Sequence, residues 1–157
     1  METFYDTHAH LDYPDYAGDL GLAIERARAA GITKIVAIGT DLESSTRAVA
    51  LSERFEGVYA AVGWHPSHAT EAPQDLRPAL RQLARHPKVV AIGETGLDYH
   101  HLPSEKPGFT LADDEPFKRK QAEIFTQQLE IAAEFGLNCV VHQRDSLEDT
   151  LAQVEAF

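Results

Sequence analysis

Residues 89–95 read VVAIGET, and this stretch decides the fold class. Its apolar residues run together, without the alternation expected of a strand that has one face in water. Such runs are typical of strands covered on both faces of a parallel sheet. Because the run ends at Glu94, the sequence predicts a buried strand with a carboxylate at its carboxyl end.

Four further apolar stretches resemble this one, and helical patterns separate them. The other predicted strands are 3–10, 34–40, 57–65 and 138–143. The predicted helices are 15–31, 41–57, 72–87, 113–136 and a last one that runs from after Ser146 to Phe157. Glycines mark three helix ends, at Gly31, Gly57 and Gly136. Repeated strand–helix units imply an α/β fold with a parallel sheet and right-handed crossovers.

Length and composition fit a single domain over residues 1–157, large enough to enclose a sizeable core. No apolar run approaches the roughly 18 residues that span a bilayer, and no signal peptide is apparent. The single cysteine, Cys139, lies in an apolar run and excludes a disulfide within one chain. These features predict a cytoplasmic protein with no membrane contact.

The charge balance argues against a basic nucleic-acid-binding surface. The chain has 14 Lys and Arg against 25 Asp and Glu, which gives a net charge of -11. Proteins that bind nucleic acid stably by counterion release display a basic face. A nucleic acid can still be a substrate if bound cations supply positive charge locally.

Polar side chains occur at the carboxyl ends of four predicted strands. They are His8, His10, His65, Glu94 and His142. In a parallel sheet these ends share one edge, where barrels and open α/β sheets alike place their chemistry. The sequence contains no glycine-rich phosphate loop, so the commonest nucleotide sites of open sheets are excluded.

Four of these residues, His8, His10, Glu94 and His142, are predicted to form a metal site. His8 and His10 share a strand face at a spacing of about 6.6 Å. Imidazole and carboxylate ligands suit Zn²⁺, and carboxylates also suit Mg²⁺ or Mn²⁺. A glutamate between two histidine half-sites can bridge two cations for two-metal hydrolysis. The alternative is that these polar residues only cap strand ends.

Two more residues are candidates for substrate binding. His65 ends a strand, although Pro66 directly after it makes a structural turn almost as good an explanation. Arg144 follows His142 and could bind an anionic group through two hydrogen bonds.

The remaining polar residues near the strand ends are less informative. Asp145 is expected to cap the last helix. For Asp98 and Tyr99, packing support and chemistry are equally good explanations. Both stand at the start of the loop 98–113, which we interpret as a long connection over the active face.

The motifs around these residues resemble one known family. They are DTHAHLD (6–12), GWHPSHA (63–69), HPKVVAIGETGLDYH (86–100) and CVVHQRDS (139–146). In this order and at these separations they resemble the TatD family of metal-dependent deoxyribonucleases, which are amidohydrolase-like barrel enzymes.

This resemblance implies a (β/α)₈ TIM barrel, of which the chain covers about five βα units. It also implies a dinuclear site that cleaves DNA phosphodiester bonds, as a 3′–5′ exonuclease. By position, His8 and His10 would hold one metal, His142 the other, and Glu94 would bridge the two.

The sequence departs from the family pattern after the fifth unit. A full barrel needs about 250 residues and eight strands. The family's later metal-binding His and its general-base Asp have no counterpart in this chain. We therefore expect a partial, truncated barrel with weak metal binding, little or no activity, and self-association through open sheet edges.

Two alternatives stay open. One is a metal-dependent amidohydrolase or phosphoesterase that acts on a small substrate. The other is a non-catalytic half-barrel fragment. The sequence does not choose between Mg²⁺, Mn²⁺ and Zn²⁺.

Overall fold

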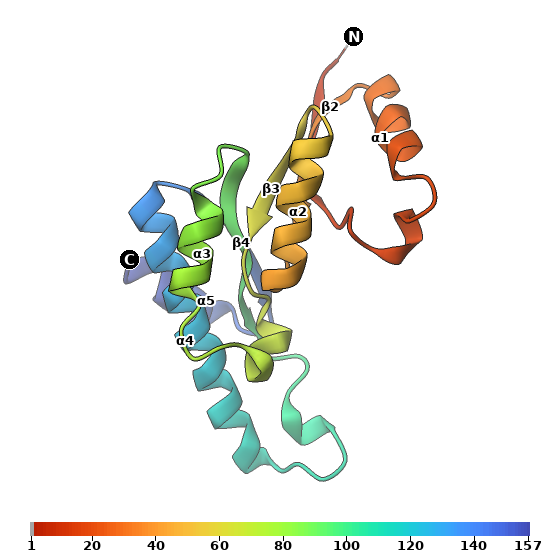
Figure 1. Ribbon diagram of the computed structural model, residues 1–157. Coiled ribbons are helices and arrows are strands. Elements are labelled where there is room, and N and C mark those ends of the chain that lie inside the picture. Colours follow the sequence, from red (N-terminus) through yellow and green to blue (C-terminus); the bar gives the residue numbers. More distant parts are fainter. Residues whose placement is uncertain (1) are drawn as a thin grey trace.

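A computed structural model describes residues 2–157; Met1, the first residue of the predicted domain, lies outside the described part. Five parallel strands form one curved sheet in the order β1-β2-β3-β4-β5 (Figure 1). The strands are β1 (Phe4–Ala9), β2 (Ile32–Ile38), β3 (Val58–Val62), β4 (Val89–Asp98) and β5 (Asn138–Arg144). The predicted α/β organisation in five units is confirmed.

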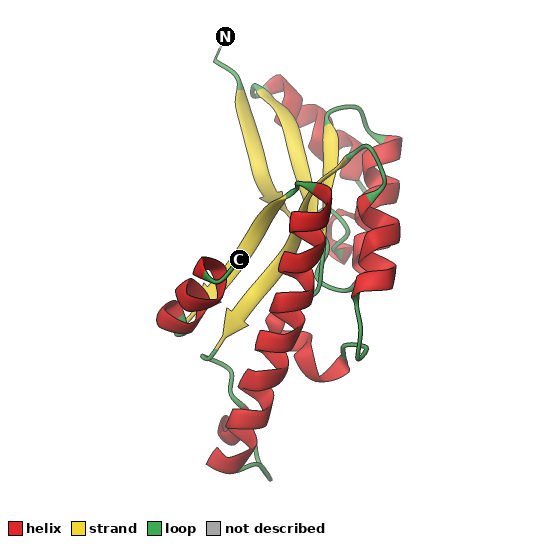
Figure 2. Ribbon diagram, turned by 90° about the vertical axis from the view of Figure 1, so that its left-hand side faces the viewer, coloured by secondary structure: helices red, strands yellow, loops and turns green. Residues whose placement is uncertain are grey.

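Each strand is followed by a helix. The helices are α1 (Leu20–Ala29), α2 (Leu42–Arg54), α3 (Arg77–Ala84), α4 (Leu111–Phe135) and α5 (Leu147–Glu155). Most of them lie together on one side of the sheet (Figure 2). None of the helices within residues 2–157 combines the length and the hydropathy needed to cross a membrane.

Two predicted helices are shorter than the sequence indicated. The first begins at Leu20 rather than at residue 15, because Pro14–Tyr16 form a separate 3₁₀ turn. The third, predicted over 72–87, covers only Arg77–Ala84, because residues 72–76, which include Pro73, are irregular. Gly31 and Gly136 end their helices with positive φ, as predicted, whereas Gly57 lies beyond the end of α2, whose C-cap is Phe55.

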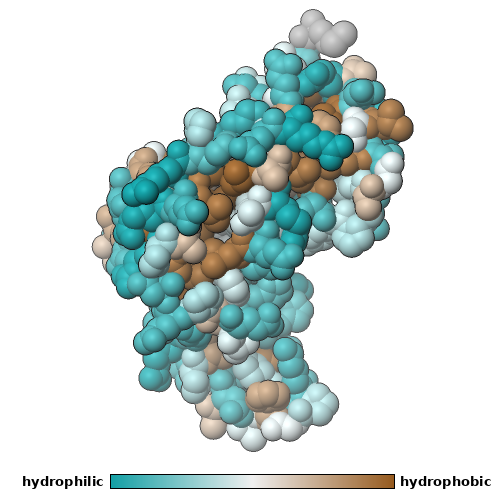
Figure 3. Space-filling model, in the orientation of Figure 1, coloured by the Kyte–Doolittle hydropathy of each residue, from teal (hydrophilic) through white to brown (hydrophobic). Residues whose placement is uncertain are grey.

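The main core lies between the sheet and its helices, and residues such as Ile92, Leu80 and Ile124 are almost fully buried in it. On one visible face, polar residues cover the helices and apolar residues gather between them (Figure 3). A smaller cluster on the other face of the sheet contains Ile38, Ala61 and Ala91.

The expectation that every strand is covered on both faces is wrong for β1 and β5. Their side chains are mostly exposed or half-exposed, with Phe4 at 53 % and Tyr5 at 59 %. Within the described chain β1 pairs only with β2, and β5 only with β4. Because each has a neighbour on one side alone, the molecule is an open, partial barrel.

Strand β4 continues beyond the predicted end at residue 95. After an irregularity between Ile92 and Thr95, its pairing with β5 resumes and runs to Asp98. Gly96 permits this close pairing, because a Cβ there would lie 2.1 Å from the His142 carbonyl oxygen. The predicted long loop is therefore shorter: it contains a 3₁₀ turn at Pro103–Glu105, and α4 begins at Leu111.

Candidate metal centre

The strand-end side chains surround one cavity of about 340 Å³, here called the metal cavity. It is lined by His8, His10, Tyr13, Thr40, His65, Ser67, His68, Glu94 and His142. Parallel pairing brings the carboxyl ends of β1 to β5 to one edge, so residues separated by more than 130 positions in the sequence meet here. The structure thus brings together the four residues predicted as metal ligands.

Glu94 lies at the centre of this arrangement. Its Oε2 is 3.4 Å from His8 Nε2 and 4.0 Å from His10 Nε2. Its Oε1 is 3.3 Å from His142 Nδ1 and 3.8 Å from His65 Nε2. Each carboxylate oxygen therefore faces a different pair of imidazoles.

The backbone of β4 positions Glu94 toward the other strands. The pairing with β5 is interrupted between Ile92 and Thr95, which places Glu94 at the irregularity. Its amide donates instead to the carbonyl oxygen of Gly39, at 3.0 Å, at the end of β2. A bulge of this kind re-aims a side chain, and bulges are frequent next to active sites.

Asp98 orients the ring of His142. The Asp98 Oδ2 lies 3.0 Å from His142 Nε2, and the carboxylate also accepts from the amides of His100 and His101. Because an ionised carboxylate can only accept, the facing Nε2 carries a proton. His142 Nδ1 is then the nitrogen that faces Glu94. Carboxylates hold metal-binding histidines in this way in many proteins.

His65 joins the same group from the end of β3. Its Nδ1 accepts from the Ser67 amide at 3.2 Å, so a neutral His65 carries its proton on Nε2. That Nε2 lies 3.1 Å from His142 Nδ1. The sequence predicted a substrate contact for His65; the structure places its Nε2 beside Glu94 and His142, and the substrate contact stays a prediction.

The pKa values follow from burial and from these contacts. Burial lowers the pKa of His65 to about 4, and the charge on Glu94 opposes this only in part. The hydrogen bond to Glu94 raises the pKa of His142 against the effect of burial. Burial raises the pKa of Glu94, but the hydrogen bond to His142 and the neighbouring histidines lower it overall. Glu94 is therefore ionised at neutral pH.

The donor set fits divalent cations. His8, His10 and Glu94 offer ligand atoms within 4.8 Å of one another, and His65, Glu94 and His142 do the same. Imidazole nitrogens and a carboxylate are ligands for Zn²⁺ and related ions. The Glu94 side chain is only 12 % exposed, so a cation would compensate a charge that is largely removed from water.

One predicted position, Asp145, differs from expectation, and a second, Arg144, stays a prediction. Asp145 does not cap α5: the residue at the N-cap is Ser146, and Asp145 has a φ of 54°. This turn directs the Asp145 carboxylate to His100 Nδ1, at 2.7 Å. Arg144 is exposed at the end of β5 and is not among the described residues that line the metal cavity. A substrate contact for Arg144 stays a prediction.

Sequence reasoning missed part of the lining, above all Tyr13 and Thr40. The Tyr13 ring stacks on that of His10, with centroids 4.8 Å apart and planes at 22°. Thr40 follows β2 and binds Ser44 through its amide. Their positions in the loops that follow β1 and β2 were a usable signal, since such loops border the active edge of α/β folds.

Comparisons with known proteins agree with this geometry. The family described as TatD related DNase matches residues 5–157. The chain is 40 % identical over 147 residues to the uncharacterized metal-dependent hydrolase YabD of Bacillus subtilis, covering 94 % of this chain and 53 % of that protein. It is 35 % identical over 153 residues to the 3′-5′ ssDNA/RNA exonuclease TatD of Cronobacter sakazakii, covering 98 % and 54 %.

A solved structure supports the same assignment. The crystal structure of YjjV, a TatD homologue from Escherichia coli K12, matches with a TM-score of 0.84 and 31 % identity, covering 98 % of this chain and 55 % of that one. The chain thus spans about half the length of the relatives it matches. On its sequence, its fold and its matches over nearly every residue, the chain belongs to the TatD related DNase family.

Proposed function

We propose that this chain supplies the dinuclear metal site of a hydrolase that cleaves phosphodiester bonds in nucleic acid. The observation that carries the proposal is the position of Glu94, whose two oxygens face two separate histidine groups. His8 and His10 would hold one divalent cation and His142 the other, with the Nε2–H of His65 positioned to donate to Glu94 or to His142. Glu94 would bridge them.

The proposed reaction depends on the bound cations, on Asp98 and on the charge of the protein surface. When bound, two divalent cations polarise a phosphoryl oxygen, lower the pKa of a water molecule and offset developing charge. Asp98 keeps the proton of His142 on Nε2, so that Nδ1 stays available as a ligand. The net charge of -11 repels a phosphate chain, so substrate would approach only where the cations reverse the local sign.

The substrate we propose is the 3′ end of a single-stranded DNA or RNA chain. Relatives such as the C. sakazakii protein are named 3′-5′ ssDNA/RNA exonucleases. A second candidate is a small phosphoester, because the metal cavity of about 340 Å³ is near the lower limit for ligand pockets.

The activity of this chain alone should be low. Of the described residues that line the metal cavity, Glu94 alone has a carboxylate, and bridging would occupy both its oxygens. No second carboxylate is then placed to accept a proton from the attacking water, which commonly costs a factor of about 10² to 10⁴ in rate.

A nuclease assay with a metal control tests the proposal. We expect slow, Mn²⁺-dependent loss of nucleotides from the 3′ end of a labelled single strand, abolished by EDTA and by Glu94→Gln. His86→Gln is the matched control, because that imidazole pairs with Glu53 outside the metal cavity. Cleavage that persists in excess EDTA, or in the Glu94→Gln variant, would refute the proposal.

A further inference from the structure

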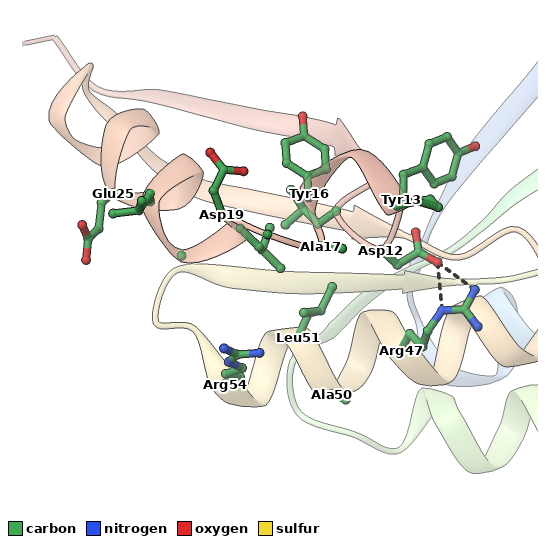
Figure 4. A pocket seen from close by; sticks show the side chains of 16 residues that line it. Asp12, Tyr13, Tyr16, Ala17, Asp19, Glu25, Arg47, Ala50, Leu51 and Arg54 are labelled. Atoms are coloured by element: carbon green, nitrogen blue, oxygen red, sulfur yellow. Dashed lines mark hydrogen bonds and ion pairs between the residues drawn. The ribbon is translucent and has the colours of Figure 1, made fainter.

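A second and larger cavity, of about 590 Å³, lies beside the metal cavity. One wall is the segment Leu11–Leu22 after β1, and the other is formed by Arg47, Ala50, Leu51 and Arg54 of α2 (Figure 4). We call it the helix cavity. Its volume falls within the range of about 300 to 1,000 Å³ that is usual for small-molecule sites.

Small residues keep the helix cavity open. A Cβ added to Gly21 on α1 would approach nothing closer than the Phe55 ring, at 4.0 Å, and one added to Gly18 would meet nothing within 4 Å. Ala17 and Ala50 line the two opposite walls. These four short residues therefore leave part of the space between α1 and α2 unfilled.

The charges in the lining do not favour an anion. The carboxylates of Asp12, Asp19 and Glu25 outnumber the guanidinium groups of Arg47 and Arg54. Arg47 is already paired, since its Nε and Nη2 donate to Asp12 Oδ2 at 3.1 and 2.9 Å. A neutral group that both donates and accepts hydrogen bonds suits this mixed lining better than a phosphate does.

The apolar part of the lining suits a ligand with a flat or hydrophobic group. Leu20, Leu22 and Leu51 line the helix cavity together with Tyr13 and Tyr16. Leu22 is 57 % exposed and Tyr13 48 % exposed, which is apolar surface available for contact. Apolar walls with a few polar groups are typical of sites for uncharged ring compounds.

Tyr13 connects the two cavities. It lines both of them, and its ring stacks on His10 at a centroid distance of 4.8 Å. The two cavities therefore adjoin at Tyr13.

We propose that the helix cavity is a nucleobase subsite, which takes one uncharged base of a strand whose phosphate lies at the metal cavity. This inference rests on the proposed function for its substrate class. A base has the required properties: it is flat, neutral, and edged with both donors and acceptors. Base stacking on aromatic and apolar side chains tolerates any sequence, as an exonuclease requires.

Nucleosides test this subsite separately from hydrolysis, because they contain no phosphodiester and need no metal. Thymidine and adenosine are titrated into the isotope-labelled chain, and amide chemical shifts are followed by NMR. We expect saturable shifts at Gly18, Gly21 and Ala50, and none at these residues with deoxyribose.

The variant Gly21→Phe should fill the cavity and weaken nucleoside binding by about tenfold or more, the loss expected for one stacked base. Gly21→Ala is the matched control, since its Cβ has free space and both changes raise helix propensity. Unchanged nucleoside binding in Gly21→Phe, equal shifts with deoxyribose, or no shifts in the wild-type chain would each overturn the subsite. If nucleosides bind as expected but the EDTA-sensitive nuclease activity is missing, the proposed function fails while the base subsite stands.

Discussion

His142 Nε2 lies 3.0 Å from Asp98 Oδ2, and this contact determines which imidazole nitrogen faces Glu94. The two residues come from adjacent strands, where Gly96 of β4 pairs with His142 of β5. The Asp98 side chain is 5 % exposed, and burial opposes its ionisation. Hydrogen bonds from His100, His142 and His101 nevertheless lower the pKa of Asp98, so it is charged at neutral pH.

The first prediction concerns this contact. Asp98→Ala should weaken Mn²⁺ binding by about 10- to 100-fold, as is usual when the carboxylate behind a ligating histidine is removed. Titration calorimetry measures the change. Asp145→Ala is the matched control, because that carboxylate binds His100 and not His142. An Asp98→Ala chain that is folded and binds Mn²⁺ as tightly as wild type would contradict the assigned role.

The second prediction concerns the start of α2. The Asp41 carboxylate accepts from the Ser44 amide at 2.6 Å, and Ser44 Oγ accepts from the Asp41 amide, which makes a capping box. Asp41→Ala should lower the free energy of unfolding by about 1 kcal/mol at pH 7, and Asp41→Asn by less. Urea denaturation gives both values.

The same cap predicts a pH dependence. Burial raises the pKa of Asp41, but hydrogen bonds from Ser44 and the charge of Arg47 lower it overall from 3.8. The pKa of Asp41 is lower in the folded state than in the unfolded state. The stabilisation by the ionised cap is therefore complete well above pH 3.8 and is lost as the pH falls through the folded-state pKa. The difference between wild type and Asp41→Ala should therefore shrink in acid. A constant difference from pH 7 to pH 2 would exclude an ionic contribution from this cap.

The third prediction concerns self-association. Three side chains on α5 and one just after it form an exposed apolar stripe beside the open edge of β5: Leu147 at 58 %, Leu151 at 50 %, Val154 at 42 % and, beyond the helix end, Phe157 at 59 % exposed. Open strand edges and apolar patches favour association. We expect reversible oligomers in sedimentation experiments, strengthened by salt because the net charge of -11 repels a second copy.

A pair of variants locates that contact. Leu151→Gln should shift the chain toward monomer, whereas Leu22→Gln, which alters a similarly exposed leucine on α1, should not. A wild-type chain that stays monomeric at high concentration and high salt would show that the edges and the stripe do not associate.

Most of the fold could be predicted from the sequence because its signals are local. Continuous apolar runs marked the central strands, and Gly136 ended α4 in the left-handed conformation that a glycine adopts without strain. The full length of β4 could not be predicted, since residues 96–98 are held in the strand by pairing with β5, which lies more than 40 positions away. The exposure of β1 likewise depends on its having one neighbour only.

The candidate site, too, could be predicted from the sequence only in part. His8, His10, Glu94 and His142 could be grouped from the sequence because strand ends meet at one edge of a parallel sheet. The role of Asp98 could not be predicted from the sequence, because it depends on the register between β4 and β5. The left-handed turn at Asp145, which leaves the capping position to Ser146, is a further tertiary effect that no local pattern indicated.

The central claim is that Glu94 bridges two cations, and electron paramagnetic resonance of the chain loaded with Mn²⁺ tests it most directly. A shared carboxylate places the two ions about 3.5–4 Å apart, close enough for their spins to couple. We predict a spin-coupled spectrum for wild type that is lost in Glu94→Gln and kept in His86→Gln. A spectrum of isolated Mn²⁺ in the wild-type chain, or a coupled spectrum that survives Glu94→Gln, would contradict the bridge.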